Sequence, residues 1–241
     1  MINLIRYVKR LLVISIRQMD FLFRKRETKK TFIFHHLPRC GGTSLRKSIK
    51  TLKHVYNDYR FGWGKFYPIK YPIDKFNEDD CLSGHFELEG CHLFQRYPEI
   101  FENSRYKVFA FIREPLDLCI SHYYYKKKNG QKVHKSINTH ILYTENYLAG
   151  ILNVNKSNYK RILDRYDFIG IFERYDESLK QLSLFFGSGS LDEIKINQAE
   201  RSSSVNTITE YDINLFKEKN SLDYLIYGYC IERFNKNNKK C

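Results

Sequence analysis

The chain has 241 residues, of which 42% are hydrophobic and 28% are charged, and its formal net charge at pH 7 is +14. This composition excludes a disordered chain and favours one globular domain with a substantial core. The positive charge suits an anionic partner such as nucleic acid, a membrane surface, an acidic glycan or a phosphate-rich cofactor. Residues 1–30 hold nine Lys and Arg against two acids, a net +7. Half of the charge therefore belongs to one terminal segment, which weakens the case for a surface built for DNA.

Residues 1–30 are predicted to form a basic amphipathic segment ahead of a single domain over 31–241. They interleave apolar residues with lysine and arginine, which is typical of a helix lying on an anionic membrane. A helix packed on the domain fits the same pattern. The longest apolar run near the start, residues 11–16, is far shorter than the ~20 residues that span a bilayer.

The cysteines are spread along the chain without a C-x-x-C pair. They predict reduced thiols and a cytoplasmic location, and no His, Cys or Asp cluster has the spacing of a metal site. The six positions are Cys40, Cys81, Cys91, Cys119, Cys230 and Cys241.

In chain order, residues 31–37 (TFIFHHL) predict a strand buried on both faces. A glycine loop then leads into a helix with apolar residues at 45, 49 and 52. Residues 54–80 show no periodicity and are predicted to be irregular. Residues 107–112 (KVFAFI) predict a second buried strand, followed by a helix over 115–128 that begins at Pro115.

The second half of the chain continues this alternation. A polar, basic loop is predicted over 126–140, a helix over 143–152, a third buried strand over 167–172, and a helix over 176–186 that Gly187 ends. Thr209 and Asp212 resemble a capping box, and a long amphipathic helix follows Asn220. The sequence therefore predicts a three-layer α/β domain with a mainly parallel sheet flanked by helices. Such sheets bind ligands at the carboxyl ends of their strands.

The segment PRCGGTSL, residues 38–45, lies where the first strand meets its helix. Glycines let the backbone approach a phosphate, and the free N–H groups of a helix start point at it. The Walker A pattern is absent, which disfavours an ATPase or GTPase. On its own the loop fits a plain turn equally well. Its candidate phosphate-binding residues are Arg39, Cys40, Gly41, Gly42, Thr43, Ser44 and Leu45.

A rival interpretation uses the same loop. Cys40 and Arg46 have the C-x5-R spacing of thiol phosphatases, in which a thiolate at a helix start attacks phosphate. Thr43 stands where those enzymes carry a glycine, so the match is incomplete.

A second candidate motif is Arg113 to Ser121, within FIREPLDLCISHYYY. Arg113 ends a predicted buried strand, where its guanidinium can fork onto a phosphate. Ser121 lies two turns into the next helix and can donate to the same group. An arginine capping a strand and a surface serine would fit as well.

Together the two motifs resemble the sulfotransferases of the heparan sulfate 2-O-sulfotransferase type and their bacterial glycan-modifying relatives. In that family the first loop holds the 5′-phosphosulfate of 3′-phosphoadenosine 5′-phosphosulfate (PAPS), and the second motif holds the 3′-phosphate. Residues 83–86 (SGHF), 166–182 and 222–227 extend the resemblance. It implies the P-loop-like sulfotransferase fold and PAPS-dependent transfer of a sulfuryl group to a hydroxyl, with a glycan as the expected acceptor and no nucleic-acid partner.

The resemblance also implies roles for single residues. His85 matches the family's base, and Arg39 would stabilise the leaving phosphate. Arg39 replaces the family's usual lysine and Cys40 its threonine, while Leu118 replaces the second arginine of the second motif. Arginine keeps the charge but is a poor proton donor. The other histidines are expected to be core or cleft residues (His35, His36) or to lie in or near the basic loop (His122, His134, His140).

Overall fold

The computed structural model describes residues 19, 21, 23–60, 67–187 and 208–238. Its centre is a five-stranded sheet in the order β2-β3-β1-β4-β5, in which each neighbouring pair is parallel. The strands are β1 Thr31–His35, β2 His54–Asp58, β3 Asp80–Gly84, β4 Tyr106–Ile112 and β5 Phe168–Ile171. The predicted parallel α/β architecture is confirmed.

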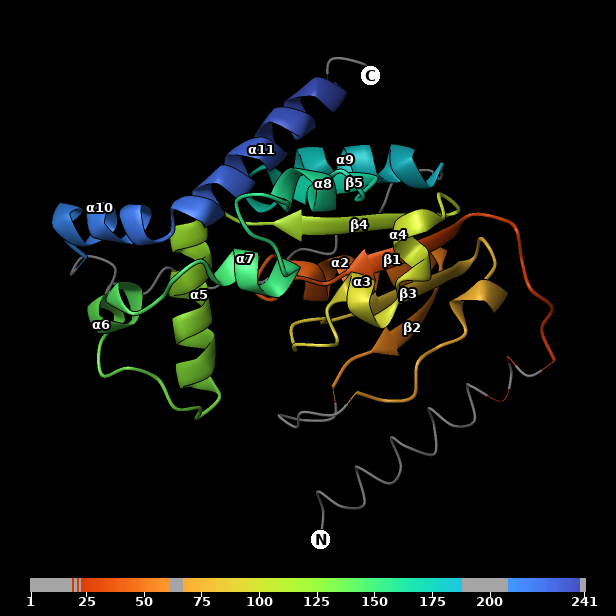
Figure 1. Cartoon of the computed structure of the whole chain (residues 1–241), viewed down its shortest axis with the longest axis horizontal. Coiled ribbons are helices and arrows are strands. Elements are labelled where there is room, and N and C mark those ends of the chain that lie inside the picture. The colour runs from red at the N-terminus through yellow and green to blue at the C-terminus, as the bar shows by residue number, and fades with distance from the viewer. Residues whose placement is uncertain (1–18, 20, 22, 61–66, 188–207, 239–241) are drawn as a thin grey trace, which may run out of the picture.

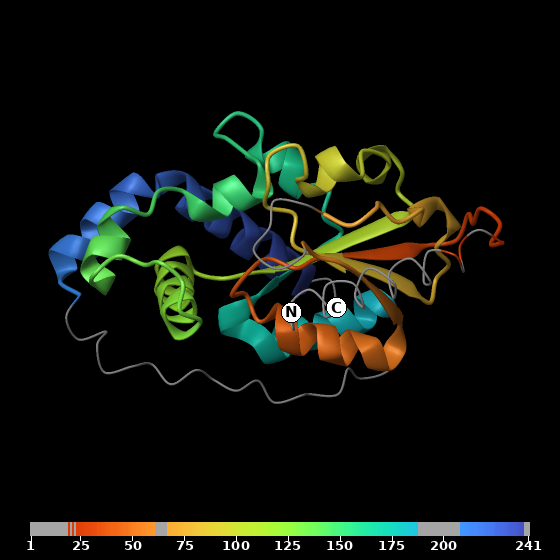
Figure 2. The ribbon, with the colours of Figure 1, turned by 90° about the horizontal axis from the view of Figure 1, so that it is seen from below.

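Helices form a layer on each face of the sheet (Figures 1 and 2). One layer contains α2 (Gly42–Leu52) and α9 (Tyr175–Phe186). The other contains α3 (Leu93–Arg96), α4 (Glu99–Glu102), α7 (Tyr147–Leu152) and α8 (Tyr159–Leu163), and α11 (Ser221–Asn238) contacts β5, α7 and α8. Two 3-10 turns, η1 Ile73–Lys75 and η2 Phe172–Arg174, complete the described elements of the main body.

A third group of helices lies beyond the carboxyl ends of the strands, at the left of Figure 1. It consists of α5 (Pro115–Lys128), α6 (Ile137–Leu142) and α10 (Glu210–Lys219). These helices share an apolar cluster that is separate from the main core, made of Cys119, Tyr123, Ile137, Ile141 and Phe216. The group forms a wall beside the edge of the sheet where ligands bind in folds of this kind.

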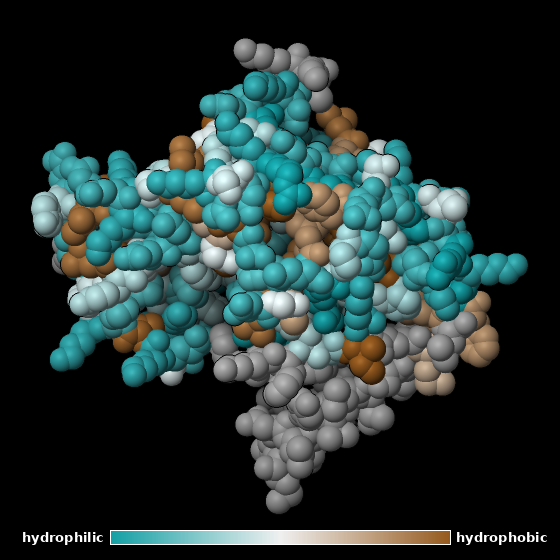
Figure 3. Space-filling view, in the orientation of Figure 1, coloured by the Kyte–Doolittle hydropathy of each residue, from teal (hydrophilic) through white to brown (hydrophobic). Residues whose placement is uncertain are grey.

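The apolar strands predicted from sequence occupy the sheet because each packs on both faces. Every residue of β1 is buried, and Phe34 stacks on Phe109 of β4 with ring centroids 5.0 Å apart. On the exposed face seen in Figure 3, apolar side chains are scattered over a mostly hydrophilic surface.

Two predicted helix ends are also confirmed. Gly187 ends α9 at a φ of 65°, and Thr209 with Asp212 forms the predicted capping box of α10.

The prediction of irregular structure over residues 54–80 is wrong. This stretch contains β2, η1 and the start of β3. β2 is an edge strand with the mixed sequence HVYND, and most of its residues are only partly buried. As an edge strand it pairs with β3 alone and is only partly buried, so no apolar run marks it in the sequence.

The boundaries between 126 and 152 also differ from the prediction. α5 continues through Lys128, and α6 takes up His140, so the basic loop is confined to residues 129–136. His122 lies on α5 and not in that loop. The helix predicted over 143–152 begins only at Tyr147, after Asn146 adopts a left-handed φ of 41°.

The described end of the N-terminal segment is attached to the domain. Phe21 is 1% exposed and stacks on Phe76, and Arg24 pairs with the buried Asp80 at 2.8 Å. Residues 1–18, on which the predicted membrane contact depends, lie outside the described residues. Within the described part of the chain, no helix is both long enough and apolar enough to cross a bilayer.

A buried ion pair fixes the carboxyl end of β2. Asp58 is fully buried and accepts hydrogen bonds from Nε and Nη2 of Arg96 at 2.7 and 2.9 Å. The hydroxyl of Tyr97 donates to the same carboxylate at 2.7 Å. This network holds the chain that leads from β2 into the candidate site.

We expect Asp58→Ala to lower the free energy of unfolding by about 3–5 kcal/mol, because it leaves the Arg96 charge buried without its partner. Glu99→Ala is the control, since it removes only a partly exposed pair with Lys70 and should cost less than about 1 kcal/mol. Urea unfolding measures both. Equal losses in the two variants would contradict this assignment.

Candidate active site

The loop between β1 and α2 has the backbone geometry of an anion-binding turn. Arg39 and Gly41 have positive φ values of 64° and 78°, and α2 begins at Gly42 without a side-chain cap. A Cβ on Gly42 would lie 2.0 Å from Cδ2 of His36, so only glycine fits there. The uncapped N–H groups at the start of α2 carry partial positive charge and can bind an anion.

The structure brings the two predicted motifs together at the carboxyl ends of β1 and β4. Nε of Arg39 donates to Oγ of Ser121 at 3.1 Å, and Nη1 of Arg113 lies 3.4 Å from the carbonyl oxygen of Arg39. The guanidinium of Arg39 lies over the ring of Tyr125, and that of Arg113 over the ring of Phe172. Parallel pairing of β1 with β4 places both strand ends at one edge of the sheet.

These two arginines form an uncompensated positive site. Burial, and next the charge of Arg113, lower the pKa of Arg39. Within the described residues neither guanidinium forms an ion pair, and Nε of Arg113 is buried without a hydrogen-bond partner. Two partly buried like charges repel, and an anion between them would relieve the repulsion.

His85 follows β3 and is held beside the loop through His36. Nδ1–H of His85 donates to the carbonyl oxygen of His36, and the two imidazoles lie 4.3 Å apart between centroids. Because a carbonyl can only accept, this bond places the proton on Nδ1 and leaves Nε2 as the basic atom. Burial lowers the pKa of His85, so the ring is neutral at pH 7.

Three further residues support His85 and were not predicted from sequence. Nδ1 of His36 lies 2.7 Å from the hydroxyl of Tyr59, which lies 2.7 Å from Oγ of Ser83. The Tyr59 ring also packs edge-on against His85 at 4.8 Å. Two features of the sequence could have pointed to this support of His85. His36 lies between a buried strand and a glycine loop, and Ser83 is the serine of the SGHF element. Tyr59 follows the unpredicted strand β2, so nothing in its local sequence marked it.

Other predicted residues take simpler places. Leu45 is fully buried in the core, so it can offer a ligand only its backbone, whereas Thr43 is exposed and Ser44 is partly buried. Leu118 is buried at 1% exposure. His35 is a core residue, as expected, with Nδ1 2.7 Å from the Tyr166 hydroxyl.

The thiol phosphatase arrangement does not form. Cys40 is 1% exposed, and burial raises the pKa of its thiol to about 12. Nη1 of Arg46 donates to Oδ1 of Asn57 at 3.3 Å, and its guanidinium lies over the Tyr59 ring. A thiol phosphatase needs an accessible thiolate, which this environment excludes.

The sheet, its two helical layers and the glycine loop at the strand ends define a three-layer α/β domain with a mainly parallel arrangement of strands. No protein-family profile and no curated protein matches the sequence. Among solved structures, the mouse sulfotransferase SULT7A1 in complex with PAP aligns with a TM-score of 0.53 and 12% identity, over 85% of this chain and 91% of its own. A sulfotransferase from Alicyclobacillus acidocaldarius aligns with a TM-score of 0.47 and 14% identity, over 83% and 97%. The likeness to the mouse enzyme confirms the predicted fold.

We expect Cys40 to resist iodoacetamide at pH 8. With a thiol pKa of about 12, on the order of 1 in 10⁴ of these groups is ionised at that pH. Cys91 is partly exposed and should be alkylated before Cys40. Mass spectrometry of a labelling time course, with a urea-unfolded sample as control, measures this. Rapid labelling of Cys40 in the folded protein would revive the phosphatase interpretation.

Proposed function

We propose that this chain is a sulfotransferase that moves a sulfuryl group from PAPS to a hydroxyl group of a glycan or glycoconjugate. The observation that carries the proposal is the pair Arg39 and Arg113, which lie beside an uncapped helix start and form no ion pair with any acid of the described residues. The mouse enzyme with this fold binds PAP, the nucleotide that remains when PAPS gives up its sulfuryl group. Arg39 and Arg113 also belong to the two sequence motifs of this chain that resemble the 2-O-sulfotransferase type.

In this proposal the two phosphate ends of the nucleotide meet different residues. The start of α2 with Arg39 would hold the 5′-phosphosulfate, where the backbone N–H groups of residues 41–44 and one guanidinium are available. Arg113 and Ser121 would hold the 3′-phosphate. Arg39 and Ser121 contact each other directly at 3.1 Å, so the two subsites adjoin.

His85 would act as the base for the acceptor. The acceptor oxygen forms a bond to sulfur while the bond between sulfur and the phosphate oxygen breaks, and Nε2 of His85 takes the hydroxyl proton. Arg39 would stabilise the negative charge that develops on the leaving phosphate. A neutral imidazole with its proton fixed on Nδ1 is the required form of the base.

The chain should bind PAP much more tightly than AMP, because Arg113 and Ser121 would meet the 3′-phosphate that AMP lacks. Arg113→Ala should weaken PAP by about tenfold to a hundredfold, the range for a lost hydrogen bond to a charged group, and leave AMP nearly unchanged. Isothermal titration calorimetry measures both, with Arg161→Ala, an exposed arginine on α8, as the control. Equal affinity of the native protein for PAP and AMP would refute the 3′-phosphate assignment.

His85→Ala should lower the rate of sulfuryl transfer by about 10²–10⁴-fold while PAP binding persists. Cys40→Ser should keep most of the activity, since that residue would offer only its backbone. Because burial lowers the pKa of His85, the base stays unprotonated at neutral pH, and the rate should fall only below about pH 6.5. Transfer of ³⁵S from PAPS to a glycan panel measures this. An active His85→Ala with an inactive Cys40→Ser would reverse the assignment.

A further inference from the structure

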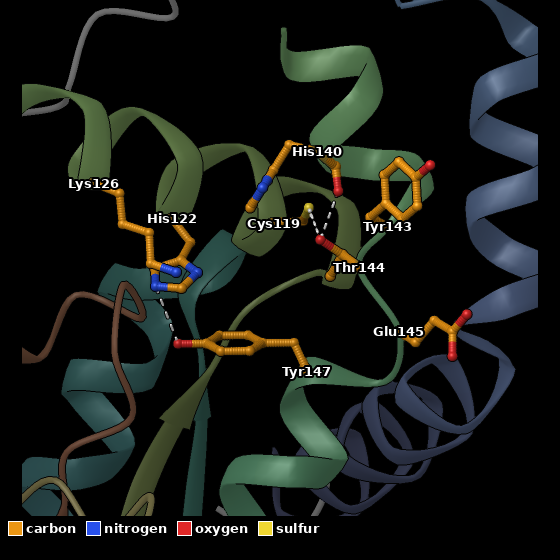
Figure 4. A pocket seen from close by; sticks show the side chains of 8 residues that line it. All are labelled: Cys119, His122, Lys126, His140, Tyr143, Thr144, Glu145 and Tyr147. Atoms are coloured by element: carbon orange, nitrogen blue, oxygen red, sulfur yellow. Dashed lines mark hydrogen bonds between the residues drawn. The ribbon is translucent and has the colours of Figure 1, made fainter. Parts of the chain in front are cut away.

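Several histidine side chains take no part in the proposed transfer. His122 and His140 line a cavity between α5, α6 and the turn into α7 (Figure 4), and His35 is enclosed in the core. His36 lies elsewhere, between the end of β1 and the start of α2. Its imidazole therefore lies within the candidate active site, although the proposed transfer uses only its backbone carbonyl.

The imidazole of His36 fills the place of a missing side chain at the start of α2. A Cβ on Gly42, the first residue of that helix, would lie 2.0 Å from Cδ2 and 2.3 Å from Nε2 of the ring. The Cα–Cβ bond of a helical residue tilts toward the N-terminus of the helix. The ring edge that carries Nε2 therefore lies at the end of α2 where the uncapped N–H groups can bind an anion.

The other ring nitrogen of His36 is connected to two hydroxyl groups. Nδ1 lies 2.7 Å from the hydroxyl of Tyr59, which lies 2.7 Å from Oγ of Ser83. Ser83 is fully buried, and across the described residues its Oγ has no hydrogen-bond partner besides Tyr59. Because a buried donor without an acceptor is costly, we infer that the Ser83 hydroxyl donates to Tyr59.

This chain of hydrogen bonds decides the tautomer of His36. A tyrosine hydroxyl has a single hydrogen, so a Tyr59 oxygen that accepts from Ser83 directs its own hydrogen to Nδ1 of His36. Nδ1 is then an acceptor, and the proton of the ring is on Nε2, beside α2. Burial, and next the charge of His85, hold the pKa of His36 well below its ordinary value, so the ring is neutral at pH 7.

The two neighbouring imidazoles of the site therefore have opposite tautomers. His85 has its proton on Nδ1, which donates to the His36 carbonyl, and its Nε2 is an acceptor. His36 has the reverse arrangement, with its ring centroid 4.3 Å from that of His85. One ring can take the proton of a hydroxyl group. The other offers an N–H to an anion at the start of α2, where a lone pair would repel it.

We propose that His36 is a second catalytic residue, whose Nε2–H donates a hydrogen bond to the 5′-phosphate oxygen from which the sulfuryl group departs. The inference rests on the proposed sulfotransferase function. As the bond between sulfur and this oxygen breaks, the electron pair stays on the oxygen, and a fixed donor stabilises the developing charge. His36 keeps its proton, and the proton of the acceptor hydroxyl goes to His85. Neutral imidazoles stabilise developing negative charge in this way in other enzymes.

The first test determines the two tautomers by ¹⁵N NMR of the full chain. We expect the ring proton on Nε2 in His36 and on Nδ1 in His85, and PAP should shift the Nε2 resonance of His36. A PAP complex with the His36 proton on Nδ1 would place a lone pair against the phosphate and overturn the proposal.

The second test removes the donor. His36→Phe keeps a ring that can stack on Phe34. It should weaken PAP by about tenfold to a hundredfold and leave adenosine 3′-phosphate, which lacks the 5′-phosphate, nearly unchanged in calorimetry. It should also lower the rate of sulfuryl transfer by about 10²-fold. His54→Phe, the same change at an exposed position of β2, should do neither. Equal weakening of both nucleotides would contradict the proposal.

A pair of amide variants decides the case if His36→Phe fails to fold, which thermal unfolding reveals. In His36→Asn the amide oxygen can accept from Tyr59, as Nδ1 does, but the side chain is too short to reach α2. In His36→Gln the amide N–H can take the place of the Nε2–H. His36→Gln should therefore bind PAP about tenfold more tightly than His36→Asn. Equal affinities would count against a donor at this position.

The native protein separates this inference from the proposed function. If it binds PAP and transfers the sulfuryl group, while His36→Phe or His36→Asn does both equally well, the role of His36 alone is wrong. If the native protein does not bind PAP, the proposed function fails, and the role of His36 fails with it.

Discussion

The repulsion between Arg39 and Arg113 is the constraint on which the candidate site depends. The two residues are 74 positions apart in the sequence. Parallel pairing of β1 with β4 nevertheless places both at one edge of the sheet. Folding thus works against the mutual repulsion of two partly buried cations. The main core and the rings of Tyr125 and Phe172 beneath the guanidiniums offset that cost. The result is a concentration of positive charge at this edge of the sheet, which an anion could bind with little reorganisation.

The same edge of the sheet positions His85. Gly42 leaves room for the His36 ring, and the His36 carbonyl fixes the tautomer of His85. A side chain at position 42 would displace His36, and with it the contact that orients His85. Gly42 therefore supports the position of His85 as well as the shape of its own loop, although Gly42 and His85 lie more than forty residues apart in the sequence.

Helix α5 lies between the candidate site and a cavity formed with α6 and the turn into α7. It carries Ser121 toward Arg39, and His122 and Lys126 line the cavity. The separate apolar cluster of α5, α6 and α10 holds this helix in place.

The sequence by itself determined the parallel α/β class, the buried strands β1, β4 and β5, and the glycine loop between β1 and α2. Continuous apolar runs, glycines at a strand-to-helix turn and capping residues are local signals, and the structure follows them. Only the tertiary structure decided the edge strand β2, the contact of Arg39 with Ser121 and the support of His85 by His36 and Tyr59. It also decided between thiol chemistry and an inert cysteine at position 40, because burial sets the pKa of a thiol and burial depends on the whole fold.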